Sequence, residues 1–386
     1  MLDYYDLADL FSPKEIRAQK QTREFVETEI APYVDYWWEE EKTPADLLLR
    51  LGELGLLEPH LPPEYGSDTS SVAAGLIVYE LERADSGLRS LVSTVALVGG
   101  VIYYYGSEEQ KKEYLPAIVK GEIVPCWALT EPQGGSDPGA METRALRDGE
   151  YYVLSGHKKW AGNGNIADIA VVWAKDEEEE AVRGFIVPTG TTGFEAKEIK
   201  RKMSMRTLVS SELTLKDVRV NESQMLPKAE GLLAPLNCLT QARYGIVWGA
   251  MGSLEAVYSE ALEFARTRTT FGGPIGSRQL VQAKLAEMVS EHTVGLLLAW
   301  RLARMRDEGT LKYAQVSLAK RNNVRAALES ARVARDILAG NGITLEYNTI
   351  RHMLNLEAES TLEGTNDVHS LVLGRDVTGF DAFGRS

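Results

Sequence analysis

The stretch from Asp148 to Ala174 reads DGEYYVLSGHKKWAGNGNIADIAVVWA. Asp-Gly is a turn dipeptide, and the runs 151–154 and 168–174 are rich in aromatic and β-branched residues, which favours strands. A short run at 184–187 and an alternating run at 212–220 continue this pattern. The middle of the chain is therefore predicted to form a β-rich region.

A glycine-containing segment in this stretch, GNGNIA at 162–167, matches a loose GxGxxA pattern. A dinucleotide-binding loop of that type needs a helix directly after its glycines. Here the run DIAVVWA follows, which favours a strand. We therefore reject a Rossmann-type phosphate loop, and the sequence also contains no P-loop, no GxSxG elbow and no kinase motif.

Helical patterns flank the β-rich region on both sides. Ser12-Pro13-Lys14-Glu15 and Ser107-Glu108-Glu109-Gln110 are capping boxes that predict helix starts. The runs 279–307 and 313–338 show apolar residues at i, i+3 and i+4, which predicts two long packed helices. The order helices, strands, helices indicates the α+β class. We expect a helical domain over 1–122, a β domain over 123–230 and a helical bundle over 231–386.

One uncharged stretch has nearly the length of a membrane span. Residues Ser90 to Ser107 carry no charge over 18 positions. Serine, threonine, a Gly-Gly pair and three tyrosines lower the apolarity of this stretch, and no basic loop flanks it. We therefore expect a buried helix that lines a core or a pocket, and no membrane span.

Composition and charge exclude several classes of protein. Lys plus Arg is 42 and Asp plus Glu is 56, giving a net charge of −14, opposite to that of a phosphate-neutralising nucleic-acid binder. The cysteines, Cys126 and Cys238, form no CxxC pair, and the five histidines form no HExxH pattern, so we expect no metal site. The acidic N-terminus has no basic n-region, which suggests a cytoplasmic location.

Four short motifs combine glycines with polar residues: LTEPQGGSD at 129–137, RTRTTFGGPIGSRQ at 266–279, DILAGNGI at 336–343 and LEGTND at 362–367. Each alone also fits an ordinary polar turn or helix end. Together, in this order and spacing, they resemble the acyl-CoA dehydrogenase family over nearly the whole chain. Further stretches resemble its glutaryl-CoA dehydrogenase subgroup: ELERADSGLRS at 80–90, KRNN at 320–323 and IRHMLNLEAE at 350–359.

The resemblance implies FAD bound between the β domain and the C-terminal bundle, with help from a neighbouring subunit of a homotetramer, a dimer of dimers. The neighbour's expected contacts include Arg268, whose planar fork suits phosphate oxygens. The expected FAD-binding residues are Leu129, Thr130, Gly135, Ser136, Trp160, Gly162, Arg268, Phe271, Gln279, Asp336, Gly340, Gly342, Thr365 and Asp367.

The resemblance also implies a catalytic base, Glu363, that removes the α-proton of an acyl-CoA thioester while a hydride leaves from the β-carbon to flavin N5. The electron acceptor would be an electron-transfer flavoprotein or dioxygen. Arg89 is expected to act at the acyl end of the site. The expected substrate-binding residues are Glu82, Arg89, Ser90, Val95, Leu362 and Arg243. The alternative for Arg89 is an internal ion pair with Glu82 or Asp85.

The chain departs from the family pattern around the expected active site. Ala161-Gly162 follows Trp160 where relatives carry Ile followed by Thr or Ser, so a hydroxyl near the flavin is missing. The other departures are Leu362, Asn366, Ala339 and the apolar run Val95-Ala96-Leu97. We expect a less polar pocket and, beside Gly162, either free space or a gap filled by a water or a neighbouring side chain. Two alternatives to plain dehydrogenation follow: an oxygen-using flavoenzyme acting on a CoA thioester, and a non-catalytic acyl-CoA-binding relic without FAD.

Overall fold

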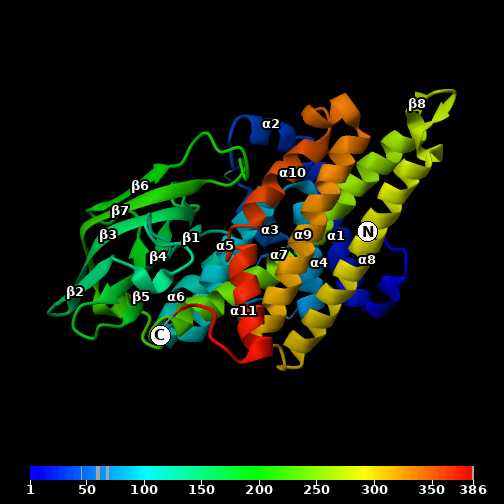
Figure 1. Ribbon diagram of the computed structural model, residues 1–386. Helices are drawn as coiled ribbons and strands as arrows, with labels where there is room; N and C mark the ends of the chain where they lie inside the picture. The colour runs from blue at the N-terminus through cyan, green and yellow to red at the C-terminus, as the bar shows by residue number, and fades with distance from the viewer. Residues whose placement is uncertain (45, 58–60, 67–68, 385–386) are drawn as a thin grey trace.

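A computed structural model describes residues 1–386 except 45, 58–60, 67–68 and 385–386. A twisted β-sheet lies beside a large group of long helices, and the N-terminal and C-terminal helices form that group together (Figure 1). The α+β class and the order helices, strands, helices are confirmed.

The N-terminal region forms helices whose starts were predicted well. At Ser12 the side chain accepts from Glu15 N, while the Glu15 carboxylate accepts from Ser12 N at 2.6 Å, so the capping box is formed. The same reciprocal pair forms between Ser107 and Gln110. The helices are α1 (Pro13–Phe25), continued by a π-helical turn (Val26–Ile30), α2 (Val34–Glu39), α3 (Leu47–Glu53), α4 (Ser71–Ala84), α5 (Ser86–Tyr105) and α6 (Glu108–Val119).

The β domain is a seven-stranded sheet, whose order is β1-β4-β2-β3-β7-β6 with β5 paired to β4. Both faces of β4 are buried, since Val171 and Trp173 pack toward the N-terminal helices and Val172 packs into a second core on the other face. This explains the continuous apolar run in the sequence. The strands are β1 (Pro125–Ala128), β2 (Arg144–Asp148), β3 (Tyr151–Gly162), β4 (Ile169–Asp176), β5 (Val182–Pro188), β6 (Phe194–Glu198) and β7 (Ser210–Asn221).

The C-terminal region forms a helical bundle with α4 in its core. A Cβ atom on Gly75 of α4 would lie 2.3 Å from the ring of Trp248, so glycine there permits the close packing of α4 against α7. A short hairpin projects from one tip of the bundle, far from the sheet (Figure 1). The elements are α7 (Leu233–Thr267), β8 (Thr269–Thr270), β9 (Gly273–Pro274), α8 (Gln279–Asp307), α9 (Tyr313–Ile337), α10 (Asn348–Glu359) and α11 (Asn366–Thr378).

Helix α5 contains the uncharged stretch noted in the sequence. Judged by length and apolar composition, it is the single helix among the described residues that could cross a membrane. However, 78% of its most apolar 18-residue segment is buried inside the protein. Val95, Val98 and Val101 belong to the core shared with the N-terminal helices. The apolarity of α5 is therefore accounted for by protein packing.

A buried carboxylate, Asp85, joins the sheet region to the bundle at the start of α5. It accepts hydrogen bonds from Thr207, which precedes β7, and from Asn355 of α10 at 2.8 Å, and it pairs with Arg351 of α10 at 3.2 Å. Asp85 also caps α5 by accepting from Gly87 N at 2.8 Å. The N-terminal end of α5 is thus fixed to two separate parts of the chain, the segment before β7 and helix α10.

Candidate active site

The predicted base, Glu363, lies in the short loop between α10 and α11. Its backbone is in the left-handed region with φ +53°, and Gly364 follows at φ +99°. For a non-glycine residue this conformation costs roughly 1–3 kcal/mol and persists only where neighbouring groups impose it. Here Arg243 Nε of α7 donates to Glu363 O at 2.7 Å, and Lys320 of α9 donates to the two flanking carbonyls.

The carboxyl group of Glu363 has the environment of a general base. Its Oε2 atom is buried and has no hydrogen-bond partner in the part of the chain that the structure describes. Burial raises the pKa of Glu363, while the positive charges of Arg89, Lys320 and Arg243 oppose that rise. A carboxylate with a raised pKa and a free oxygen can accept a proton from a ligand beside it.

Arg89 of α5 is fully buried and already has two protein partners. Its Nε donates to Glu82 Oε2 at 2.7 Å, and its Nη2 donates to Glu359 of α10. The internal pair with Glu82 is thus formed, whereas Asp85 pairs with Arg351 instead. Arg89 Nη1 is buried without a partner among the described residues. Burial and the neighbouring Glu359 carboxylate raise the pKa of Glu82 well above its usual value.

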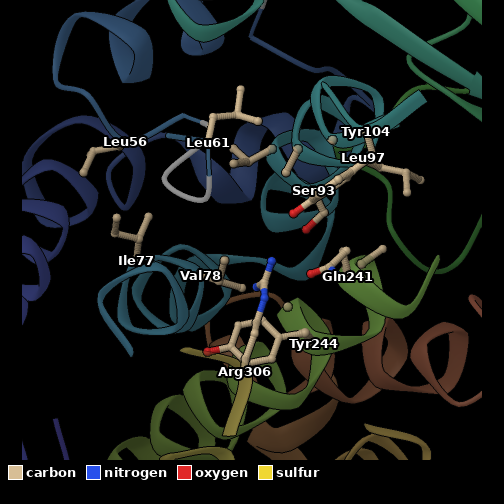
Figure 2. Close-up of a pocket in the computed structure, with 15 residues that line it drawn as sticks. Leu56, Leu61, Ile77, Val78, Ser93, Leu97, Tyr104, Gln241, Tyr244 and Arg306 are labelled. Carbon is tan, nitrogen blue, oxygen red and sulfur yellow. The ribbon is translucent and has the colours of Figure 1, made fainter. Parts of the chain in front are cut away.

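An apolar cavity of about 50 Å³ lies between α4, α5 and α7, next to this charged cluster. In Figure 2, Ser93 and Leu97 of α5 face Gln241 of α7 across it. Its wall includes Ala242 and Gly245 of α7, which flank Arg243 closely in the sequence. Arg243 in turn donates to Glu363 O, so the same stretch of α7 contacts both the cavity and the loop of the predicted base.

Not every residue predicted at the substrate lies on this wall. Val95 is buried but does not line the cavity, whereas its neighbours Val92, Ser93 and Ala96 do. Leu362 packs against the bundle core. Ser90 Oγ is buried, with no partner in the described chain, so it remains available to a ligand.

Two predicted FAD-binding residues of the β domain lie side by side. Lys159 N donates to Thr130 O at 2.8 Å, which places Thr130 beside Trp160. The β3–β7 register shifts between Lys158 and Ala161, and Trp160 has φ +60° and is 56% exposed. A bulge of this kind re-aims a side chain, here a large aromatic, away from the sheet.

The rest of the LTEPQGGSD motif is held by a buried ion pair. Lys158 Nζ contacts Glu131 at 2.7 Å and Leu129 O at 3.1 Å, so Leu129 has a structural role through its backbone. Gly135 has open space where a Cβ would lie, with its nearest neighbour at 3.9 Å, and Ser136 is exposed. The two residues therefore remain available to a ligand.

The expected free space beside Gly162 is not present. A Cβ atom there would lie 2.9 Å from Thr94 Oγ1, because α5 passes this end of β3. Ala161 is buried within the sheet core. Of the two alternatives at this position, the one in which a neighbouring side chain fills the gap agrees with this geometry, because the side chain of Thr94 occupies it and brings a hydroxyl group to the same place.

A second group of predicted FAD contacts lies on the projecting hairpin and the adjacent helix ends, away from Glu363. Arg268, Phe271 and Gln279 are exposed, Phe271 to 98%. One chain does not bring them to Thr130 and Trp160 (Figure 1). Asp336 pairs with Lys284, which lowers its pKa.

The glycine turn after α9 serves the fold as well as any ligand. A Cβ on Gly342 would lie 2.4 Å from Arg335 O, so glycine is required there for packing, while Gly340 has open space. Ala339 has φ +53°, a conformation for which glycine is better suited. Thr365 caps α11 by accepting from Val368 N at 3.1 Å, and Asp367 is exposed in its first turn.

Sequence reasoning missed three residues of this site: Thr94, Lys320 and Glu359. Lys320 and Glu359 lie in the KRNN and IRHMLNLEAE motifs but received no role. A buried lysine or glutamate in a regular helix is rare and requires a partner, which is the signal that could have identified them. No group of histidine, cysteine or acidic side chains that could hold a metal ion occurs among the described residues.

Comparison with known proteins follows the same three-part division. Three family models match: the acyl-CoA dehydrogenase N-terminal domain at residues 12–122, its middle domain at 126–218 and its C-terminal domain at 229–378. The chain belongs to the acyl-CoA dehydrogenase family.

Glutaryl-CoA dehydrogenases are among the relatives of this acyl-CoA dehydrogenase. A crystal structure of the Mycobacterium smegmatis enzyme is 47% identical, with a TM-score of 0.96 and coverage of 98% of this chain and 97% of that chain. A second structure of a glutaryl-CoA dehydrogenase from that organism, in complex with FADH2, is 45% identical, with a TM-score of 0.97 and 99% coverage of both. The Desulfococcus multivorans glutaryl-CoA dehydrogenase is 30% identical over 94% of this chain and 95% of its own length.

The cofactor of this acyl-CoA dehydrogenase is FAD. The residues present fit a flat aromatic group: Trp160 presents an exposed indole, Gly135 leaves room for close approach, and Asn366 Oδ1 is buried with no partner in the described ranges. The oxidoreductase class and the glutaryl-CoA dehydrogenase-like character of the chain are confirmed.

Proposed function

We propose that the protein oxidises an acyl-CoA thioester between its α- and β-carbons, with Glu363 as the base. The observation that carries this proposal is the buried, unpartnered Oε2 atom of Glu363, in a loop held by Arg243 and Lys320. A free carboxylate oxygen in a partly dry site has no structural purpose, and it costs stability unless a ligand uses it.

The residues of the chain account for the proton half of the reaction. The Glu363 carboxylate accepts the α-proton, and the electron pair of that C–H bond forms the new double bond as a hydride leaves the β-carbon. Bound FAD supplies the acceptor for that hydride. Backbone N–H groups of the loop are the donors available to the thioester oxygen, where negative charge develops. The product is the α,β-unsaturated thioester.

Residues Thr130, Ser136 and Trp160 of the β domain would hold the flavin from one subunit. Arg268, Phe271 and Gln279 lie too far along the bundle to serve that subunit, and their exposure suits contact with FAD in a neighbouring copy. We therefore retain the homotetramer as part of the proposal. An electron-transfer flavoprotein is the proposed acceptor for the reduced flavin.

The substrate class is proposed to be a thioester with a distal carboxylate, as the names of the glutaryl-CoA dehydrogenase relatives suggest. Two donors support it, since Arg89 Nη1 and Ser90 Oγ are both buried and unpartnered within the described residues. Arg89 is paired with Glu82 and Glu359, and its Nη1 atom is the donor that remains for a substrate anion.

The test is anaerobic mixing of the yellow holoenzyme with a panel of acyl-CoA thioesters while flavin bleaching is followed. Glu363→Gln should retain FAD and bind ligand but slow flavin reduction by at least ~10³-fold, the scale of a lost positioned base. The matched control is Glu357→Gln, since Glu357 is exposed on α10 and pairs with Arg332. Reduction of the Glu363→Gln enzyme at the wild-type rate would remove Glu363 from the mechanism. A colourless protein that binds no FAD would support the relic alternative.

A further inference from the structure

Three successive carbonyl groups around the base are all held by two cations, the buried Lys320 and the half-buried Arg243. Lys320 Nζ donates to Leu362 O at 2.7 Å and to Gly364 O at 2.6 Å, and Arg243 Nε donates to Glu363 O at 2.7 Å. Lys320 is completely buried. No carboxylate forms a salt bridge with it in the described part of the chain, so the loop carbonyls are its main partners.

The direction of these bonds fixes the direction of the loop amides. In a trans peptide the C=O and N–H groups point in opposite directions. Because Leu362 O points to Lys320, the N–H of Glu363 points away from Lys320, and the N–H of Gly364 likewise points away from Arg243. Among the described residues neither N–H has an acceptor. The loop therefore presents two adjacent free donors beside the Glu363 carboxyl group.

A cation bound to a carbonyl oxygen also strengthens the N–H of the same peptide as a donor, because hydrogen-bonded groups polarise one another in a low-dielectric site. Burial lowers the pKa of Lys320 to about 8, while the negative charge of Glu363 raises it, so the ammonium form is present at neutral pH. The positive charge of Lys320 and the negative charge of Glu363 thus each favour the charged form of the other residue.

We propose that Lys320, acting through the carbonyls of Leu362 and Gly364, is a positioning residue that orients and polarises the Glu363 N–H toward the thioester oxygen. Arg243 acts in the same way on the next peptide, where it binds Glu363 O and so orients the N–H of Gly364. This inference rests on the proposed function, because it needs a thioester carbonyl beside Glu363. The same contacts explain how the loop maintains the left-handed conformation at Glu363.

The experiment measures the carbonyl stretch of a bound, non-reducible acyl-CoA analogue carrying a ¹³C-labelled thioester carbon, by isotope-edited infrared difference spectroscopy of the holoenzyme. In wild type we expect a band shifted well below its position in water. In Lys320→Met most of that shift should be lost, and flavin reduction should slow about 10- to 100-fold with little change in KM, less than the loss of a whole oxyanion donor. Lys320→Arg should retain much of the shift.

Lys202 provides a matched control, because its Nζ also donates to two backbone carbonyls, Met205 O at 2.9 Å and Leu208 O, but in the loop before β7. Lys202→Met should leave the band unchanged even if it lowers thermal stability. If Lys320→Met does not retain FAD, the comparison uses Lys320→Gln, which keeps a shorter donor. An unshifted band in wild type, or a wild-type band in FAD-loaded Lys320→Met or Lys320→Gln, would overturn the proposal. If those bands change as expected while Glu363→Gln still reduces flavin normally, the proposed function fails separately.

Discussion

Thr94 Oγ1 of α5 lies 2.9 Å from the point that a Cβ atom on Gly162 of β3 would occupy. The two positions therefore share one small volume at the junction of helix and sheet. A larger residue at either position requires a smaller one at the other.

This relationship predicts the effect of restoring a hydroxyl residue at position 162. Gly162→Thr should lower the free energy of unfolding by ~1–3 kcal/mol, the usual cost of overpacking. Adding Thr94→Ala should recover much of that loss, because it removes the atom in closest contact. Urea unfolding of the four proteins in this cycle measures the coupling. Purely additive effects would show that the two side chains do not compete for space.

The filled junction also predicts slow reaction with oxygen. Since Thr94 occupies the volume that Gly162 leaves free, we expect no open path for dioxygen at this edge of the cofactor. The reduced wild-type enzyme should reoxidise slowly in stopped-flow mixing with air-saturated buffer, and ¹⁸O from labelled dioxygen should be absent from the product. Fast reoxidation or labelled product would instead support the oxygen-using alternative.

Arg89→Met should change the ranking of substrates. We expect kcat/KM to fall at least ~10-fold more for a glutaryl-type than for a butyryl-type thioester, because a hydrogen bond to a charged group contributes about 1.5–3 kcal/mol. Stability should fall by ~3–5 kcal/mol in any case, since Glu82 and Glu359 lose their partner. Substrate ranking is therefore the discriminating measurement, and an equal loss for both thioesters would mean that Arg89 serves the internal pairs alone.

The raised pKa of Glu363 predicts a pH-dependent stability change. A carboxyl group whose pKa is higher in the folded than in the unfolded state binds more protons when folded, so its contribution to stability falls as pH rises through the folded pKa. Glu363→Gln has no such group. The stability of Glu363→Gln minus that of wild type should therefore increase as pH rises from acidic to neutral. Thermal unfolding of both holoenzymes over this pH range measures the difference. The control is Glu357→Gln, for which we expect a flat difference.

Arg268→Met should weaken retention of FAD if this residue serves a neighbouring subunit. Gel filtration followed by the 450 nm absorbance per chain measures the loss, and light scattering checks that the number of chains per particle is unchanged. Arg147→Met is the control, since Arg147 is exposed on β2 and pairs with Glu222. Equal FAD content in all three proteins would contradict the shared site.

Capping boxes and apolar periodicity predicted those helix ends and strands that depend only on neighbouring residues. The capping boxes at Ser12 and Ser107 give correct helix starts, and the 279–307 run coincides with α8. The short strands β1, β2 and β6 were not distinguished, because four or five residues carry too little periodicity. Tyr151–Leu154 was recognised, but β3 continues to Gly162 through a bulge that no local pattern signals.

The sequence identified the segments that carry the site residues, but not the contacts between those residues. Glu363, Arg89 and Trp160 stand in recognisable segments, whereas the Lys320 contact with Leu362 spans 42 positions and the Arg89 contact with Glu359 spans 270. Such contacts depend on how helices pack, which sequence spacing does not determine. For the same reason Val95 was assigned to the pocket, whereas the cavity is lined by its neighbours Val92, Ser93 and Ala96.

Helix α5 lines the cavity through Ser93 and Ala96, and through Thr94 it contacts the end of β3 that is proposed to lie beside the flavin. Its first turn is anchored by Asp85. Selection for a longer or bulkier acyl group cannot move this helix without also altering the surroundings of the cofactor. New substrate range in this lineage should therefore arise by exchange of single side chains on one helix face, and substitutions that broaden the substrate range by shifting α5 should carry altered flavin reactivity as a by-product.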